Sequence, residues 1–390
     1  MSRPTFAPKK GMGEMNIAMF SDTWETDGVS NSIKRARMGL EAQGHKVYLF
    51  ASSSGKVGWH GDDYFFKGYA FPFYPTYRLS FMPKDISKDI LEREIDVIHV
   101  HTPAFVGVKG MLASFRLKIP SVFTYHTDFL QALGVYVSVL PPKTLRKAGM
   151  VFLNYLLQDF NAIVFPSEYT RKTTDSWLKV EGKRFVFPTG IDLAKFHVEP
   201  GNGKCLPEEV EKARTDGKKI ILTVGRVAPE KNLELIFKAM KVLDDDYILF
   251  VAGKGPYLKY CKATYESEKI RFLGFVPDFD LPLLYSVADC FVIASKFDTQ
   301  GMVIHEAMAC GTPVAAINYG AMPEFVDDDC GRLFLGENAP AVAMAIWEVC
   351  HERKYLGDMA RKRVARNDID VFVKNLVTVY RAVVKSSRSC

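Results

Sequence analysis

The amino-acid sequence predicts an α/β protein in which two doubly wound, Rossmann-like domains face each other across a cleft. Short apolar runs alternate with longer segments of helical periodicity, and this alternation occurs in each half of the 390 residues. Strands that are apolar throughout are typical of parallel sheets covered by helices on both faces. A polar segment containing Gly and Pro, residues 199–209, separates the two series and predicts the linker.

The apolar runs define the expected strands in chain order. In the first half they lie at 15–21, 46–51, 97–101, 121–126, 162–167 and 184–188. In the second half they lie at 219–225, 247–253, 270–276, 290–295 and 313–318. We therefore expect an amino-terminal domain at 1–200 and a carboxyl-terminal domain at 201–370. Residues 371–390 are expected to form a terminal helix that returns to the amino-terminal domain.

Composition limits the class of protein. Hydrophobic residues make up 48% and charged residues 25%, which is ordinary for a globular chain. All seven cysteines lie in the second half without a CxxC pair, so we expect free thiols in a reducing compartment and no zinc site. No signal peptide or run of about 20 apolar residues is present, which predicts a cytoplasmic protein that at most lies peripherally on the cytoplasmic face of a membrane.

Charge is concentrated within residues 97–150, which carry six bases and one acid, Asp128. Apolar residues are interleaved with these bases, from Phe129 and Leu130 to Val137 and Leu140. Such a region can meet anionic lipid headgroups, nucleic acid or an anionic substrate. The structural alternative is a solvated basic face beside an ordinary core helix. The bases are Lys109, Arg116, Lys118, Lys143, Arg146 and Lys147.

Loops that follow the carboxyl ends of strands are the expected ligand sites in doubly wound domains. After the first strand, Gly28 precedes a helix expected to begin at Ser30 or Asn31, where a ligand could approach the backbone and the helix amides could hold an anion. A glycine in this place is also common in ordinary turns. The dinucleotide pattern GxGxxG is absent, which counts against an NAD enzyme.

Two cations follow the first strand of the second half. Arg226 and Lys231 lie in the loop 224–232, beside Gly225. Two cations in this place could bind a diphosphate whose negative charge increases as it leaves. The alternative is that both are solvated bases on the surface.

Two carboxylates lie in the loop and helix at 297–314. Asp298 precedes Gly301, which opens a helix whose first amides could bind an anion. Glu306, inside that helix, could accept hydrogen bonds from sugar or ribose hydroxyls. A surface carboxylate is the alternative for Glu306, but its neighbours, Met302 and Val303 among them, are apolar and indicate a buried segment.

Histidines end two strands of the first half. His126 and Asp128 follow one of them, and His99 and His101 lie at the end of another. A histidine at this edge of a sheet is a candidate site residue, although a lone histidine is more often packed in the core. The spacing of the three histidines matches no metal-ligand pattern, so no metal is expected.

Taken in order, these motifs resemble the retaining glycosyltransferases of family 4, which have the GT-B fold. The resemblance covers roughly residues 15–335, and within the family DTQGM and YHTDF are most similar to enzymes that glucosylate diacylglycerol. The motifs are GVSNSI (28–33), HVHTP (99–103), YHTDF (125–129), VFPSEYTR (164–171), PTGID (188–192), VGRVAPEKN (224–232), VAGKGP (251–256), FLGFV (272–276) and the loop from Asp298 to Glu306.

The resemblance implies roles for particular residues. Arg226 and Lys231 match the pair of bases on the donor diphosphate, and Glu306 matches the glutamate that holds the nucleotide ribose. Asp298 stands where the family has its other glutamate, near the sugar hydroxyls. His126 matches the histidine beside the transferred sugar. Donor binding is thus expected at Gly28, Gly225, Arg226, Lys231, Asp298, Gly301, Met302, Val303 and Glu306.

The sequence departs from the family pattern in three places. Asp298 replaces a glutamate and is shorter by one methylene, His305 stands where an apolar residue is usual, and NYGAMPE (318–324) has one glycine where two are common. The resemblance implies transfer of a hexose, glucose favoured, from a nucleotide sugar, UDP favoured, to a lipid such as diacylglycerol. It implies neither a cofactor nor a nucleic-acid partner, and leaves an anionic membrane surface as a possible partner. The alternatives are a soluble or polyisoprenoid-linked acceptor, or a non-catalytic protein that binds sugar or nucleic acid.

Overall fold

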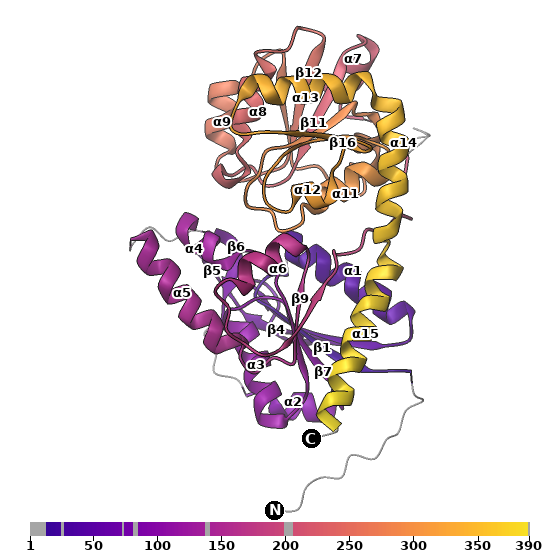
Figure 1. Ribbon diagram of the computed structural model, residues 1–390. Coiled ribbons are helices and arrows are strands. Elements are labelled where there is room, and N and C mark those ends of the chain that lie inside the picture. Colours follow the sequence, from indigo (N-terminus) through magenta and orange to yellow (C-terminus); the bar gives the residue numbers. More distant parts are fainter. Residues whose placement is uncertain are drawn as a thin grey trace, which may run out of the picture.

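Two α/β domains make up the computed structural model, which describes residues 13–24, 27–71, 74–80, 85–136, 141–198 and 206–388. The domains lie end to end, with the amino-terminal one at the bottom of Figure 1. Each has a largely parallel sheet between layers of helices, which confirms the predicted fold class. Part of the expected linker, 199–205, lies outside the described residues, as do Val137 and Leu140.

The amino-terminal sheet has the strand order β10-β9-β8-β7-β1-β2-β4-β3 and is parallel except where β3 meets β4. A separate antiparallel hairpin is formed by β5 (Tyr69–Phe71) and β6 (Tyr74–Leu79). The sheet strands are β1 (Asn16–Ser21), β2 (Lys46–Ser53), β3 (Gly58–His60), β4 (Asp63–Lys67), β7 (Val97–Val100), β8 (Ser121–Thr124), β9 (Ala162–Phe165) and β10 (Lys183–Val186).

Alternate side chains of these strands enter two cores, one on each face of the sheet, because successive residues of a strand point to opposite faces. Ile17 and Met19 of β1 pack on one side and Ala18 and Phe20 on the other. The helices of this domain are α1 (Gly28–Ala42), α2 (Ser87–Glu92), α3 (Phe105–Leu117), α4 (Phe129–Tyr136), α5 (Pro142–Leu157) and α6 (Glu168–Asp175).

The carboxyl-terminal sheet is parallel throughout, in the order β13-β12-β11-β14-β15-β16. Its strands are β11 (Lys219–Val224), β12 (Tyr247–Ala252), β13 (Ile270–Gly274), β14 (Cys290–Ile293), β15 (Val314–Ile317) and β16 (Gly331–Phe334). Its helices are α7 (Glu208–Thr215), η1 (Pro229–Lys231), α8 (Leu233–Met240), α9 (Leu258–Tyr265), α10 (Leu281–Val287), α11 (Met302–Ala309), α12 (Met322–Phe325), α13 (Ala339–His351) and α14 (Arg353–Val364).

The last helix, α15 (Ile369–Arg388), follows η2 (Ala365–Asn367) and runs down the side of the amino-terminal domain (Figure 1). Its residues Val373, Leu376 and Tyr380 are buried in the same core as α1 and β1. The two helices approach closely at Gly39 of α1, where a Cβ would lie 2.4 Å from Cγ2 of Val373. Glycine therefore sets the distance between α1 and α15.

The structure differs from the sequence prediction at the edges of the sheets. The segment 58–79, where no strand was predicted, contains β3 to β6, and β16 was not predicted either. These strands are short and carry polar residues or glycine, so they lack the continuous apolar run on which the prediction depended. The first helix begins at Gly28 instead of Ser30 or Asn31, because the side chain of Asp27 caps it by accepting from Ser30 N at 2.8 Å.

We expect Gly39→Ala to lower the free energy of unfolding by about 1–3 kcal/mol, because the new methyl group overpacks the contact with Val373. Val373→Ala makes room for the new methyl group, so the double variant should lose less free energy of unfolding than the two single variants lose together. Urea denaturation measures all three variants. Gly55→Ala is the control, since a Cβ there meets nothing within 4 Å. Strictly additive losses would contradict a steric contact at this position.

Candidate functional site

A cleft of about 960 Å³ lies where the carboxyl ends of both parallel sheets face each other. It is lined from both domains, by loops that follow β1, β7 and β8 on one side and β11, β12 and β14 on the other. The structure brings every residue expected at the site to this cleft. They are Gly28, His126, Gly225, Arg226, Lys231, Asp298, Gly301, Met302, Val303 and Glu306.

Arg226 is held by two backbone loops that run side by side. Val227 N donates to Lys254 O at 3.0 Å, and Gly225 N donates to Ala252 O at 2.9 Å. Gly253 permits this approach, since a Cβ there would lie 1.8 Å from Gly225 O and its φ is +148°. The Arg226 side chain, 18% exposed, lies 3.4 Å from Glu230 Oε1. It is therefore no solvated surface base.

Lys231 and Asp298 form an ion pair inside the cleft. Lys231 Nζ lies 2.8 Å and 2.9 Å from the two carboxylate oxygens of Asp298, and the side chains are 25% and 20% exposed. Burial alone would raise the pKa of Asp298, but the charge and hydrogen bonds of Lys231 outweigh it and lower that pKa below its usual value. Asp298 is thus a carboxylate at neutral pH, next to a cation that can also face an anionic ligand.

Glu306 is buried, which excludes the alternative of a surface carboxylate. It lies in the second turn of α11, whose N-cap is Gly301 with a φ of +71°. Its Oε2 accepts a hydrogen bond from Tyr285 at 3.1 Å, and its Oε1 is paired at 2.5 Å with Arg35 of the amino-terminal domain. Each oxygen retains a further lone pair for a hydroxyl group.

His126 belongs to a row of histidines in the amino-terminal domain, of which His126 and His101 line the cleft. Its Nε2 lies 2.9 Å from Nδ1 of His101, and the His101 ring lies over that of His99 with centroids 3.9 Å apart. Burial lowers the pKa of His126 to about 4 and that of His99, aided by the charge of His126, to about 3. These imidazoles are neutral at pH 7, so they act as hydrogen-bonding groups and not as charges.

The segment 298–301 also connects the two domains. Thr299 Oγ1 donates to His126 O at 2.6 Å, while Ser167 Oγ donates to Thr299 O at 2.8 Å. The Gln300 amide pairs with the backbone of Thr189, accepting from its N at 2.9 Å and donating to its O at 3.0 Å. Residues next to Asp298 and Gly301 thus hold the opposite wall in place.

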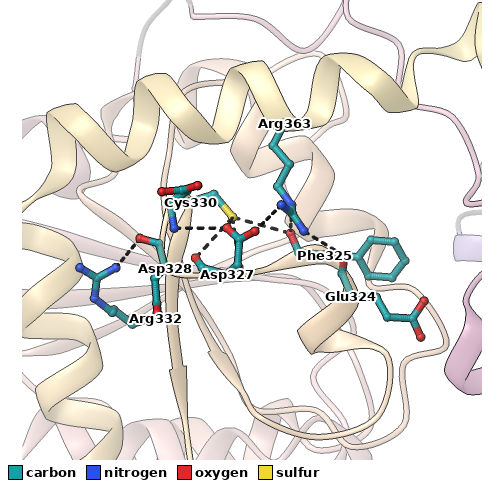
Figure 2. Close-up of polar contacts among 8 residues, drawn as sticks. Glu324, Phe325, Asp327, Asp328, Cys330, Arg332 and Arg363 are labelled. Carbon is teal, nitrogen blue, oxygen red and sulfur yellow. Dashed lines mark hydrogen bonds and ion pairs between the residues drawn. The ribbon is translucent and has the colours of Figure 1, made fainter.

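Glu324 makes a second connection. Its carboxylate accepts hydrogen bonds from the first two amides of α6, Glu168 N at 2.8 Å and Tyr169 N at 2.5 Å. Figure 2 shows how α12 is itself held by Arg363 of α14, which donates to Phe325 O at 2.9 Å and Glu324 O at 3.1 Å and pairs with Asp327. The carboxylate is therefore placed to cap a helix of the other domain.

Sequence reasoning missed the residues that act between domains. Arg35, Gln300 and Glu324 each bond to a residue more than 100 positions away. Nothing in the local pattern of residues predicts such pairs. Asp27 was detectable, because an aspartate directly before a segment of helical periodicity indicates an N-cap.

His305, one of the departures from the family pattern, is packed as an apolar side chain. It is 2% exposed and meets the ring of Phe325 edge-on with centroids 4.8 Å apart. Neither ring nitrogen has a hydrogen-bond partner among the described residues. Burial lowers its pKa to about 4, and the charges of Arg35 and Arg363 act in the same direction.

Comparison with known proteins identifies the class. Residues 26–195 match the model of Glycosyltransferase Family 4, and residues 207–366 match that of Glycosyl transferases group 1. Over 85% of this chain and 77% of the relative, the sequence is 31% identical to an alpha-monoglucosyldiacylglycerol synthase of Streptococcus pneumoniae. A GDP-mannose-dependent alpha-mannosyltransferase of Mycobacterium tuberculosis is 26% identical over 95% of this chain and 97% of its own.

The fold is also found in solved structures. HepE of Anabaena, determined in complex with UDP and glucose, has a TM-score of 0.70 and 16% identity over 94% of this chain and all of its own. The chain thus belongs to the family 4, group 1 glycosyltransferases with the GT-B fold, for which a retaining reaction is typical. It is an enzyme, which sets aside the alternative of a non-catalytic binding protein.

No helix among the described residues is both long and apolar enough to cross a membrane. Their His, Cys, Asp and Glu side chains form no group of three or more that could hold a metal ion.

We expect His305 to make the protein less stable in acid. Below about pH 6.5 the unfolded chain binds a proton at this histidine, whereas the folded chain does so only near pH 4, so stability falls as the pH decreases between these values. His305→Met should remove roughly 2 kcal/mol of this acid penalty between pH 7 and pH 4.5. Urea denaturation at pH 7 and pH 4.5 measures it, with His60→Met on the surface as control. An unchanged difference between the two pH values would contradict the assignment.

Proposed function

We propose that this enzyme transfers glucose from UDP-glucose to diacylglycerol, with retention of anomeric configuration and without a divalent metal ion. The observation that carries the proposal is the composition of the cleft. One wall carries paired cations and a helix N-terminus, and the other contributes apolar side chains, Leu79, Phe129 and Leu133. Similarity to the monoglucosyldiacylglycerol synthase supports the choice of both substrates.

The carboxyl-terminal wall fits a nucleoside diphosphate sugar. Arg226, Lys231 and the first amides of α11 can neutralise the charge that develops on the leaving diphosphate, the task that a metal ion performs in other transferases. Glu306 would accept hydrogen bonds from the ribose, and Asp298 from the sugar. His126, neutral at pH 7, would hydrogen-bond to the transferred sugar from the other wall.

The reaction breaks the bond between the anomeric carbon and the diphosphate oxygen and forms one to the acceptor oxygen on the same face. The proton of the attacking hydroxyl passes to the leaving phosphate oxygen, so charge and atoms balance without a further reactant. The protein contributes orientation and electrostatic stabilisation of the leaving group.

A lipid acceptor has to reach the cleft from a membrane, and α5 has the surface for this contact. Lys143, Lys147, Val151 and Tyr155 follow one another at intervals of four residues, and all are exposed, Val151 by 71% and Tyr155 by 67%. A helix with basic and apolar residues on one exposed face binds at the headgroup boundary of anionic membranes. Of the bases predicted for this region, Lys109 instead packs over the ring of Phe66 at 5.3 Å.

We expect Lys231→Ala to lower kcat for glucosylation of diacylglycerol by about 10²- to 10³-fold, because a cation is lost where charge develops in the transition state. Radiolabelled UDP-glucose and product separation measure the rate, and the wild-type rate should persist in EDTA.

Lys262→Ala is the control for this variant. Lys262 also pairs with a carboxylate, Glu266 at 3.3 Å, but lies on the surface outside the cleft. Unchanged turnover of Lys231→Ala would contradict the role of Lys231. A wild-type enzyme that accepts GDP-mannose but not UDP-glucose, or that needs added Mg²⁺, would refute the donor or the metal-free reaction.

We expect binding to vesicles to rise with their anionic lipid content and fall with salt. Changing Lys143, Arg146 and Lys147 to Glu should weaken it by about two orders of magnitude, since each base contributes about 1 kcal/mol near an anionic surface. Co-sedimentation measures the effect. The control changes three exposed bases of the other domain, Lys212, Arg214 and Lys259, to Glu. Binding that ignores lipid charge, or equal losses in both triple variants, would contradict the contact through α5.

A further inference from the structure

Two polar atoms on the amino-terminal wall of the cleft have no hydrogen-bond partner among the described residues. They are Oδ2 of Asp27 and Nε2 of His101. Both atoms are buried within the protein, and both side chains line the cleft. His101 is 3% exposed. An unpaired buried polar atom lowers stability by about 1–3 kcal/mol, so such atoms are expected where a ligand completes the pairing.

The fold places these two side chains in the loops that follow neighbouring strands. β1 and β7 are adjacent and parallel, and His101 N donates to Phe20 O at 2.9 Å, just beyond the last paired residues. Asp27 follows β1 and caps α1, while His101 follows β7. The two loops are bonded to each other, since Asp22 pairs with Thr102, next to His101, and Thr23 Oγ1 lies 3.4 Å from Oδ1 of Asp27.

Each side chain uses one polar atom for structure, and its other polar atom is the unpaired one. Oδ1 of Asp27 accepts from Ser30 N at 2.8 Å as the N-cap of α1. Nδ1 of His101 lies 2.9 Å from Nε2 of His126. Burial raises the pKa of Asp27, although hydrogen bonds from Ser30 act in the opposite direction. The carboxylate is therefore poorly solvated, which makes it a strong hydrogen-bond acceptor.

We propose that Asp27 and His101 together bind the acceptor hydroxyl that attacks the sugar. The hydroxyl group donates to Oδ2 of Asp27 and its oxygen accepts from Nε2–H of His101. This pairing requires that His126 Nε2–H donates to Nδ1 of His101. One hydroxyl then satisfies both unpaired atoms, and the remaining lone pair of its oxygen is free to form the new bond. The proposal rests on the proposed function, because it assigns the acceptor end of that reaction.

The position of this pair agrees with its role. Gly28, next to Asp27, faces Met302 of the donor wall, and His126, next to His101 in space, is bonded through its carbonyl to Thr299 of the donor loop. A hydroxyl held between Asp27 and His101 therefore lies beside the segment that carries Asp298. The two residues orient the hydroxyl group before the reaction. As its oxygen bonds to the anomeric carbon, its hydrogen bond moves from Oδ2 of Asp27 to the leaving phosphate oxygen, which takes the proton.

Asp27→Asn tests the proposal without removing the cap of α1, because the amide oxygen can still accept from Ser30 N while the NH₂ group replaces Oδ2. The acceptor is 1,2-dioleoylglycerol in vesicles that contain roughly 30 mol% anionic phosphatidylglycerol. We expect kcat/KM for this acceptor to fall about 10- to 100-fold. The Kd for UDP and the slow hydrolysis of UDP-glucose by water should keep their wild-type values.

Two matched variants separate binding from structure. Asp85→Asn makes the same change at another helix start, where Oδ1 accepts from Ser87 N at 2.9 Å outside the cleft, and should leave transfer unchanged. Asp27→Ala removes the cap as well and should lower the melting temperature, whereas Asp27→Asn should not. Wild-type acceptor kinetics in Asp27→Asn would overturn the assignment, and so would a parallel loss of UDP binding.

A binding measurement is independent of transfer. With UDP present, 1,2-dioctanoylglycerol should raise the melting temperature of the wild-type protein and leave that of Asp27→Asn unchanged. No rise in the wild type, or an equal rise in both proteins, would overturn the acceptor site. Failure of the proposed function has a different signature: a wild-type protein that binds dioctanoylglycerol in this assay but does not glucosylate it from UDP-glucose.

Discussion

Four consecutive residues, Asp298 to Gly301, determine how the two domains and the ligand site are related. Asp298 pairs with Lys231, Thr299 and Gln300 bond to the opposite domain, and Gly301 starts α11 in a left-handed conformation. Because these bonds come from one short segment, the donor wall cannot shift relative to the amino-terminal wall without breaking them. The geometry of the cleft therefore depends on the same residues that would contact the sugar.

Ligand binding and the contact between the two domains consequently depend on the same side chains. Arg35 crosses from α1 to Glu306, the carboxylate assigned to the ribose, and both side chains are about one tenth exposed. A ligand that engages Glu306 thus meets a carboxylate already held by the other domain. This arrangement orients the carboxylate before the ligand arrives, which reduces the reorganisation needed at the moment of reaction.

Most of the fold could be predicted because central parallel strands are apolar on both faces, as KIILTV in β11 is. Edge strands such as β3 and β16 are short, carry polar residues or glycine, and were missed for that reason. The residues of the cleft could be located because ligands bind beyond the carboxyl ends of such strands. Pairs such as Arg35 with Glu306 could not, since their contact exists only after both domains have folded and met.

The return of α15 to the amino-terminal domain has a consequence for synthesis of the chain. Phe372, Val377 and Val383 belong to the core that β1 and α1 begin, yet they follow the whole second domain in the sequence. At 5–20 residues per second, a ribosome needs roughly 15–65 s to make the segment between them. During that interval the part of α1 around Gly39 that packs on α15 is uncovered. The nascent chain therefore passes through a stage in which its later domain can be complete while its earlier one is not.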